Sequence, residues 1–183
     1  MMGKKYKKEI FLVIGFALAV MLINLPFAYT ANYHRITGAP TGENGSIDLT
    51  SVKADGSKIY LDGEWQFYWN RFIETDREKA LSPALLIRVP DAWSMYESGG
   101  KKLPAAGFGS YKLTVNGYDY DREVAIYIPD FGGAYRLYLD GQLAAESGTV
   151  SKVVNKIFTV PKSQIYPVTI GERAPHEIII EVA

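Results

Sequence analysis

Few residues in this chain have the types and spacing that metal or nucleophilic chemistry requires. The two histidines, His34 and His176, are 142 residues apart, and the chain has no cysteine. A metal site needs clustered His, Cys, Asp or Glu ligands, and a thiolate nucleophile or a disulfide needs Cys. The phrase GGAY at Gly132 has no helix after it, and GFGS at Gly107 opens a strand, unlike phosphate-binding loops. We therefore expect no metal and no cofactor.

Paired carboxylates are the groups that hydrolyse glycosidic bonds. Asp62 and Glu64 flank a turn glycine, and a second acidic group, Asp119, Asp121 and Glu123, lies in the phrase NGYDYDRE. Both sets are most simply explained by the solvation of a turn. We expect no catalytic residue in this chain, so it is not predicted to be an enzyme; the activity of a longer protein stays open.

Loop aromatics offer a different kind of chemistry, because the faces of sugars stack on Trp and Tyr rings while polar side chains fix their orientation. Trp93 and Tyr96 lie in DAWSMYESGG, and Phe131 and Tyr135 lie in DFGGAY, each beside glycine. We predict these four residues as ligand-binding. The alternative for Trp93 is that it closes one end of the core.

Short segments in which apolar and polar residues alternate must position these loops. In EWQFYW, residues Trp65, Phe67 and Trp69 fall on one face, which predicts a strand with that face buried. Asp140-Gly141 suits a two-residue hairpin turn. Only Phe72–Leu81 has a helical pattern. Similar signals predict strands at 47–51, 58–61, 85–89, 111–115, 124–128, 135–139, 142–146, 155–160 and 177–182.

This pattern predicts an all-β body of two packed sheets over residues 47–183. The stretch TGAPTGENGS is typical of a linker, which we place at 31–46. The chain ends inside the apolar run HEIIIEVA, so we expect the body to be truncated at its C-terminal end.

The first thirty residues predict a membrane anchor. Residues 1–9 hold four lysines, and Ile10–Leu25 contains no charged residue. About 20 helical residues span a hydrocarbon core, so we place a transmembrane segment at 10–30 in contact with membrane lipid. By the positive-inside rule, residues 1–9 are a cytoplasmic tail and the body is extracytoplasmic, at the cell membrane. A cleaved signal peptide is the alternative, although the region of Ala28 to Ala31 matches a cleavage site poorly.

The charge of the body argues against nucleic-acid binding. Four of the 20 cations and one of the 20 anions lie in residues 1–9, which leaves 16 cations against 19 anions in the remainder, a net charge of −3. Nucleic-acid-binding domains carry a basic patch or stripe, and this body has none in its sequence.

Four phrases in fixed order carry a resemblance to a known fold. They are YLDGEWQFYW from Tyr60, VPDAW from Val89, GFGSYKLTV from Gly107 and YRLYLDGQLAAESG from Tyr135. The set resembles the galactose-binding-domain-like jelly roll, found as the N-terminal domain of glycoside hydrolase family 2 enzymes. It is also similar to the extracellular domain of bacterial seven-transmembrane receptors with diverse intracellular signalling modules. The resemblance implies a jelly-roll-like β-sandwich.

Details of the phrases favour the receptor family. Family 2 glycosidases commonly carry an aromatic-Arg pair after the VPxxW phrase and an Asn-Gly hairpin, whereas this chain has Tyr111-Lys112 and Asp140-Gly141. The receptor resemblance implies a ligand-sensing domain whose full-length protein is a signal transducer such as a sensor histidine kinase. The alternative is the sugar-binding domain of a family 2 glycosidase. A small-molecule ligand, with carbohydrate as its class, is implied by fold analogy alone.

The predicted topology is testable with fused reporters. A reporter enzyme that is active only outside the cytoplasm, fused after Ala183, should be active in whole cells, because the N-terminal lysines hold the N-terminus in the cytoplasm. A reporter active only in the cytoplasm, fused at the same residue, is the control and should be inactive. The reverse pair of activities would contradict the topology.

Overall fold

The structure, a computed structural model, describes residues 13–16, 40–52, 58–76, 84–117, 122–171 and 175–183. The chain divides into two units, residues 1–39 and residues 40–183. In the first unit only residues 13–16 are described, and they are helical. The rest of the predicted transmembrane segment and the first part of the linker lie outside the described residues. Within the described ranges, no helix has the length and apolarity needed to cross a membrane.

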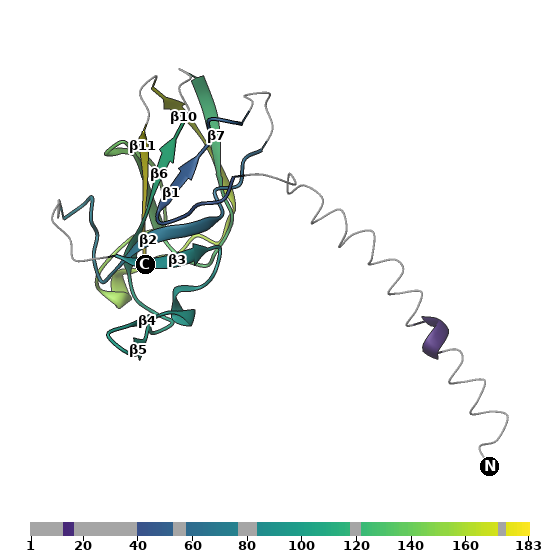
Figure 1. Ribbon diagram of the computed structural model, residues 1–183. Coiled ribbons are helices and arrows are strands. Elements are labelled where there is room, and N and C mark those ends of the chain that lie inside the picture. The colour runs from purple at the N-terminus through teal and green to yellow at the C-terminus, as the bar shows by residue number, and fades with distance from the viewer. Residues whose placement is uncertain (1–12, 17–39, 53–57, 77–83, 118–121, 172–174) are drawn as a thin grey trace, which may run out of the picture. The chain divides into compact units, whose positions relative to one another are not determined.

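The second unit is built almost entirely of strands (Figure 1). Two short 3-10 helices, η1 (Trp93–Met95) and η2 (Val154–Lys156), lie in loops. The strands are β1 (Ser46–Asp48), β2 (Gly63–Trp69), β3 (Leu85–Val89), β4 (Glu97–Ser98), β5 (Lys101–Lys102), β6 (Gly109–Asn116), β7 (Arg122–Ile128), β8 (Tyr135–Leu139), β9 (Gln142–Ser147), β10 (Gln164–Ile170) and β11 (His176–Val182).

The main sheet has the strand order β3-β2-β6-β11-β8-β9, with β1 added parallel to β6. All other pairings are antiparallel. A second sheet consists of β7 and β10, and β4 and β5 form a separate hairpin at the lower end of the domain in Figure 1. The chain's last strand, β11, therefore lies at the centre of the main sheet.

The core fills the space between the two sheets, as expected for a sandwich. Leu113, Leu137 and Ile178 from the main sheet are buried in one cluster with Ile128 and Val168 from the second sheet. Residues directly opposite each other in a sheet point to the same face, so the alternation read from the sequence places one apolar face of each strand inward. The prediction of an all-β, sandwich-like body is confirmed.

Most predicted strands are present, but three predicted elements differ. Residues 58–61 form no strand, and the Leu61 carbonyl accepts a hydrogen bond from the Trp65 Nε1–H at 2.8 Å instead of from a neighbouring strand. Residues 155–160 form part of η2 and a single bridge between Phe158 and Thr149. The predicted helix 72–81 is a single turn at 73–76, and its remainder lies outside the described residues.

One long strand, β10, was not predicted. Pro167 interrupts its apolar pattern, and proline lacks the N–H that a central strand needs. In the structure β10 pairs only with β7, with Pro167 opposite Ala125. A two-stranded sheet leaves one side of each strand without a main-chain partner, so proline is tolerated there.

Candidate functional site: the aromatic loop end of the sandwich

Three of the four aromatic residues predicted to bind ligand lie at one end of the main sheet. Trp93 packs on Trp69, with ring centroids 5.7 Å apart, and Phe131 packs on Tyr135 at 5.6 Å. Trp69 and Tyr135 lie in one cross-strand row that runs through Trp69, Gly109, Val182 and Tyr135. Three strand spacings of about 4.8 Å separate the two pairs by about 14 Å. The structure therefore brings Trp93, Phe131 and Tyr135 to one end, with Trp93 apart from the other two. Tyr96 instead contacts Arg88, which pairs with Glu64 near the other end of β2.

Trp93 and Tyr96 are held by contacts within the domain. The Trp93 ring stacks on Phe67 at 5.9 Å, and its Nε1–H donates to the Pro104 carbonyl at 2.8 Å. The Tyr96 hydroxyl accepts the Arg88 N–H at 2.8 Å and donates to the Asp91 carboxylate at 3.1 Å. These contacts close one end of the core, the alternative considered for Trp93. A part for either residue in ligand binding stays a prediction.

Tyr135 is also an interior residue, only 3% exposed. Its hydroxyl lies 3.0 Å from that of Tyr166 on β10, which joins the two sheets. Burial raises the pKa of Tyr135 above its ordinary value, and the hydrogen bond with Tyr166 raises it further. Burial likewise raises the pKa of Tyr111 to about 12. Both phenols therefore stay neutral near pH 7.

Phe131 is the member of the four that faces solvent, with 49% of its surface exposed. Two glycines set its position. Gly132 has φ +77°, in the left-handed region that favours glycine, and a Cβ at Gly133 would lie 2.5 Å from the Phe131 ring. The loop backbone therefore comes so close to the ring that any side chain at Gly133 would displace it.

Polar groups surround the Phe131 loop. Asp130 Oδ1 accepts the Gly132 N–H at 2.9 Å, and the Asp130 N–H donates to Ser163 Oγ at 3.1 Å. The second bond links this loop to the start of β10. An exposed ring beside a surface carboxylate and a hydroxyl combines an apolar stacking face with hydrogen-bonding groups, the combination that polar ligands such as sugars require.

A buried carboxylate, Glu181 on β11, lies on the opposite face of the main sheet and is 0% exposed. Its Oε1 accepts the N–H groups of Glu74 and Thr75, at 3.1 and 2.8 Å. Its Oε2 accepts the Thr75 hydroxyl at 2.5 Å and lies 3.4 Å from Arg136 Nη1. A buried charge is tolerated only when it is paired and hydrogen-bonded, and Glu181 meets both conditions.

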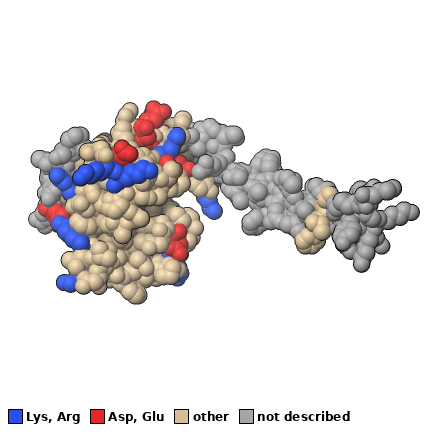
Figure 2. Space-filling model, turned by 90° about the horizontal axis from the view of Figure 1, so that it is seen from below, with Lys and Arg blue, Asp and Glu red and all other residues tan. Residues whose placement is uncertain are grey.

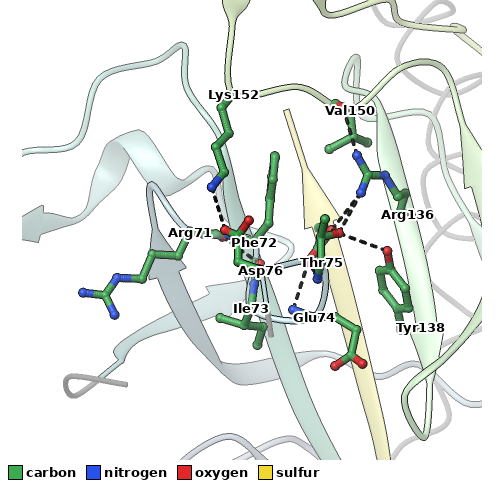
Figure 3. Close-up of polar contacts among 12 residues, drawn as sticks. Arg71, Phe72, Ile73, Glu74, Thr75, Asp76, Arg136, Tyr138, Val150 and Lys152 are labelled. Carbon is green, nitrogen blue, oxygen red and sulfur yellow. Dashed lines mark hydrogen bonds and ion pairs between the residues drawn. The ribbon is translucent and has the colours of Figure 1, made fainter. Parts of the chain in front are cut away.

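The contacts around Glu181 also hold the loops at the aromatic end. Arg136 Nη2 donates to the Val150 carbonyl at 3.0 Å, and Lys152 pairs with Asp76 at 2.7 Å (Figure 3). The Phe72 ring lies between these two cations, 5.7 Å from Arg136 and 5.9 Å from Lys152. We call this set of contacts the Glu181 cluster, made of Glu181, Arg136, Thr75, Tyr138, Phe72, Asp76, Lys152 and Val150.

Loop residues complete the support. Phe72, Ala134 and Val150 form a buried group with Ile157 and Ala183 packed against it. Ala134 and Ala183 exchange two main-chain hydrogen bonds of 2.9 and 3.0 Å. Ala134 follows the Phe131 loop and Val150 opens the loop after β9. These contacts therefore fix both loops to the main sheet.

The sequence analysis missed the Glu181 cluster. In the β11 sequence HEIIIEV, Glu181 shares a face with Ile179, and both are buried. An isoleucine beside glutamate on the supposed outer face was the available signal that this face is covered. The covering residues, 71–76, lie more than 100 positions away in the sequence.

The described residues contain no group of three or more His, Asp or Glu side chains placed to hold a metal. His176 is buried and its Nδ1 lies 2.9 Å from Asp140 Oδ2, beside the β8–β9 turn. Glu64 accepts the Asn44 N–H at 3.1 Å. Asp119 and Asp121 lie outside the described residues. Ligand binding at the aromatic end stays a prediction.

No protein-family model matches the chain, and no curated protein matches it. Solved structures similar to it include the GH2 β-galacturonidase from Eisenbergiella tayi bound to galacturonate, at 11% identity and a TM-score of 0.41 over 64% of this chain. The β-glucuronidases of Ruminococcus gnavus and Faecalibacterium prausnitzii are 13% and 20% identical, each with a TM-score of 0.47 over 67% of this chain. The match covers 17% to 20% of those chains.

Glu181 gives a stability prediction. Glu181→Gln keeps the size of the side chain but removes its charge and presents an amide donor to existing donors, so it should lower the free energy of unfolding by about 2–4 kcal/mol. Urea unfolding of the full chain in detergent, followed by tryptophan fluorescence, measures the change. All three tryptophans lie in the body.

Glu177→Gln is the matched control, because Glu177 is on the same strand and the same face but is partly exposed and pairs with Lys112. It should cost at most about 1 kcal/mol, as surface ion pairs do. Equal losses for the two variants would contradict the role given to Glu181.

Proposed function

We propose that this chain is an extracytoplasmic ligand-recognition domain that binds a carbohydrate at the aromatic loop end and acts by binding, without chemistry of its own. The observation that carries the proposal is Phe131: a half-exposed ring packed on Tyr135, in a loop held by the hydrogen bonds of Asp130 with Gly132 and Ser163. A ring held in place stacks on a ligand without first losing conformational freedom.

One face of the domain is largely uncharged. Figure 2 looks at the domain from the end that carries the β4–β5 hairpin, and it shows charged side chains gathered along one side of a broad uncharged area. Sugars present apolar ring faces and neutral hydroxyl groups, so an uncharged surface with a few polar groups favours them over strongly charged ligands.

The context we propose is a membrane-anchored bacterial signalling receptor. The support is the N-terminal sequence, in which four lysines precede an uncharged apolar segment, together with the receptor-like phrases. Binding would shift the population of states of the attached membrane helices. The alternative is the sugar-binding domain of a family 2 glycosidase. Reading the gene beyond Ala183 separates them: seven hydrophobic spans support the receptor, and a barrel-type hydrolase supports the glycosidase.

Binding at Phe131 is tested by thermal unfolding of the full chain in detergent with a panel of neutral and acidic sugars. A sugar at about 100 times its Kd should stabilise the native chain by about 2.7 kcal/mol and raise its melting temperature. Phe131→Ala should weaken binding at least about tenfold, which is ~1.4 kcal/mol. Phe131→Tyr should retain it, because the ring is kept.

Tyr127→Ala provides the control, since Tyr127 is an exposed aromatic residue on the second sheet. It should leave the sugar-induced shift unchanged. The proposal fails if no sugar raises the melting temperature, or if a sugar does so equally in the Phe131→Ala variant.

A further inference from the structure

The loop between β9 and β10, residues 148–163, exposes more apolar surface than a connecting loop needs. Val153, Val154, Phe158 and Val160 are 50%, 68%, 65% and 36% exposed. No residue of η2, which this loop contains, is buried. Isolated exposed apolar residues are ordinary, whereas four of them within residues 153–160 of one loop indicate an interaction surface.

The loop holds these side chains outward in a fixed conformation. Ile157 and Val150 point inward and pack with Phe72 and Ala134. Thr149 and Phe158 exchange two main-chain hydrogen bonds, of 2.7 and 3.3 Å, across the base of the loop. The loop therefore uses two apolar side chains as anchors and presents four others to solvent.

The charges on this loop have one sign. Residues 147–171 contain Lys152, Lys156 and Lys162 and no Asp or Glu. Lys152 is paired with Asp76, whereas Lys156 and Lys162 are exposed and form no ion pair with any described carboxylate. Besides Asp76, Asp130 contacts the loop, through its N–H, which donates to Ser163. Two cations without described carboxylate partners thus flank the exposed valines and Phe158.

From this arrangement we infer that the β9–β10 loop docks on an anionic lipid surface. Exposed aliphatic and Phe side chains enter the boundary between headgroups and acyl chains, while lysines contact anionic headgroups. The residues that dominate protein–protein hot spots, Trp, Tyr and Arg, are absent from residues 148–163, and lysine is depleted in such interfaces. The composition therefore favours lipid over a protein partner.

The predicted anchor would keep the body that carries this loop near a bilayer. Residues 31–39 separate the predicted transmembrane segment from the described body, and nine residues extend at most about 30 Å. A body tethered at that distance meets the lipid surface at high effective concentration, so weak contacts suffice. The inference goes beyond the proposed function and does not depend on Phe131.

A single fluorescent label tests the inference. The chain has no cysteine, so Val154→Cys gives one labelling site for an environment-sensitive dye. The full chain is reconstituted in vesicles of phosphatidylcholine and in vesicles of phosphatidylcholine with phosphatidylglycerol. Quenching by acrylamide measures how exposed the dye is to water. Because acrylamide is uncharged, the anionic vesicle does not repel it.

In the phosphatidylglycerol vesicles, the label at 154 should shift its emission to the blue and be quenched several-fold less than in phosphatidylcholine alone. Leu143→Cys is the control, because Leu143 is 53% exposed and lies in β9 beside the hairpin turn, at the opposite end of the main sheet. Its label should be quenched equally in both vesicles. Adding Lys156→Gln and Lys162→Gln to the Val154→Cys chain should remove the difference.

Three results would overturn the inference. The label at 154 could be quenched as strongly as the label at 143 in both vesicles. Its protection could be the same with and without phosphatidylglycerol, which would deny the role of charge. Its protection could rise with the protein-to-lipid ratio, which would identify a second copy of the chain as the occupant.

Discussion

The aromatic end of this domain depends on one buried carboxylate. Glu181 lies on the central strand of the main sheet and is fully buried, so it must be compensated where it stands. The groups that compensate it come from residues 74–75 and from Arg136, and Arg136 in turn holds the Val150 carbonyl. Because the buried Glu181 carboxylate must be compensated, three separate parts of the chain are fixed to the same face of the sheet.

The two surfaces that we propose as functional are both carried by this support. Ala134 fixes the Phe131 loop and Val150 fixes the β9–β10 loop, and both pack against Phe72, which lies between Arg136 and Lys152. The Asp130–Ser163 hydrogen bond links the two loops directly. Loops usually carry binding residues on a rigid scaffold, and here the Glu181 cluster attaches the two loops to the sheet that serves as the scaffold. A ligand at Phe131 and a lipid surface at Val154 would therefore act on neighbouring parts of one rigid end.

The sequence predicted what local periodicity controls and missed what distant contacts control. Alternation in EWQFYW and in YRLYL located β2 and β8. Asp140-Gly141 located the turn between β8 and β9, where both residues have positive φ. Pro167 concealed β10, because proline is tolerated in this strand only since β10 pairs on one side, with β7. Phe158 was assigned to a strand because apolar and polar residues alternate around it. Glu181 was not singled out, since the residues that cover it are encoded more than 100 positions earlier. The neighbouring glycines pointed to four aromatic candidates, but they did not indicate that Phe131 alone among them is exposed while Tyr135 is buried.

Hydrogen–deuterium exchange of the full chain and its Glu181→Gln variant, resolved by peptide, tests this dependence most directly. Local opening raises exchange only in the segments that lose support. The account predicts faster exchange in residues 71–76, 129–134 and 148–163, with unchanged exchange in β7 and β10. Faster exchange spread evenly over both sheets, or no change in the two loops, would contradict the claim that Glu181 holds the aromatic end together.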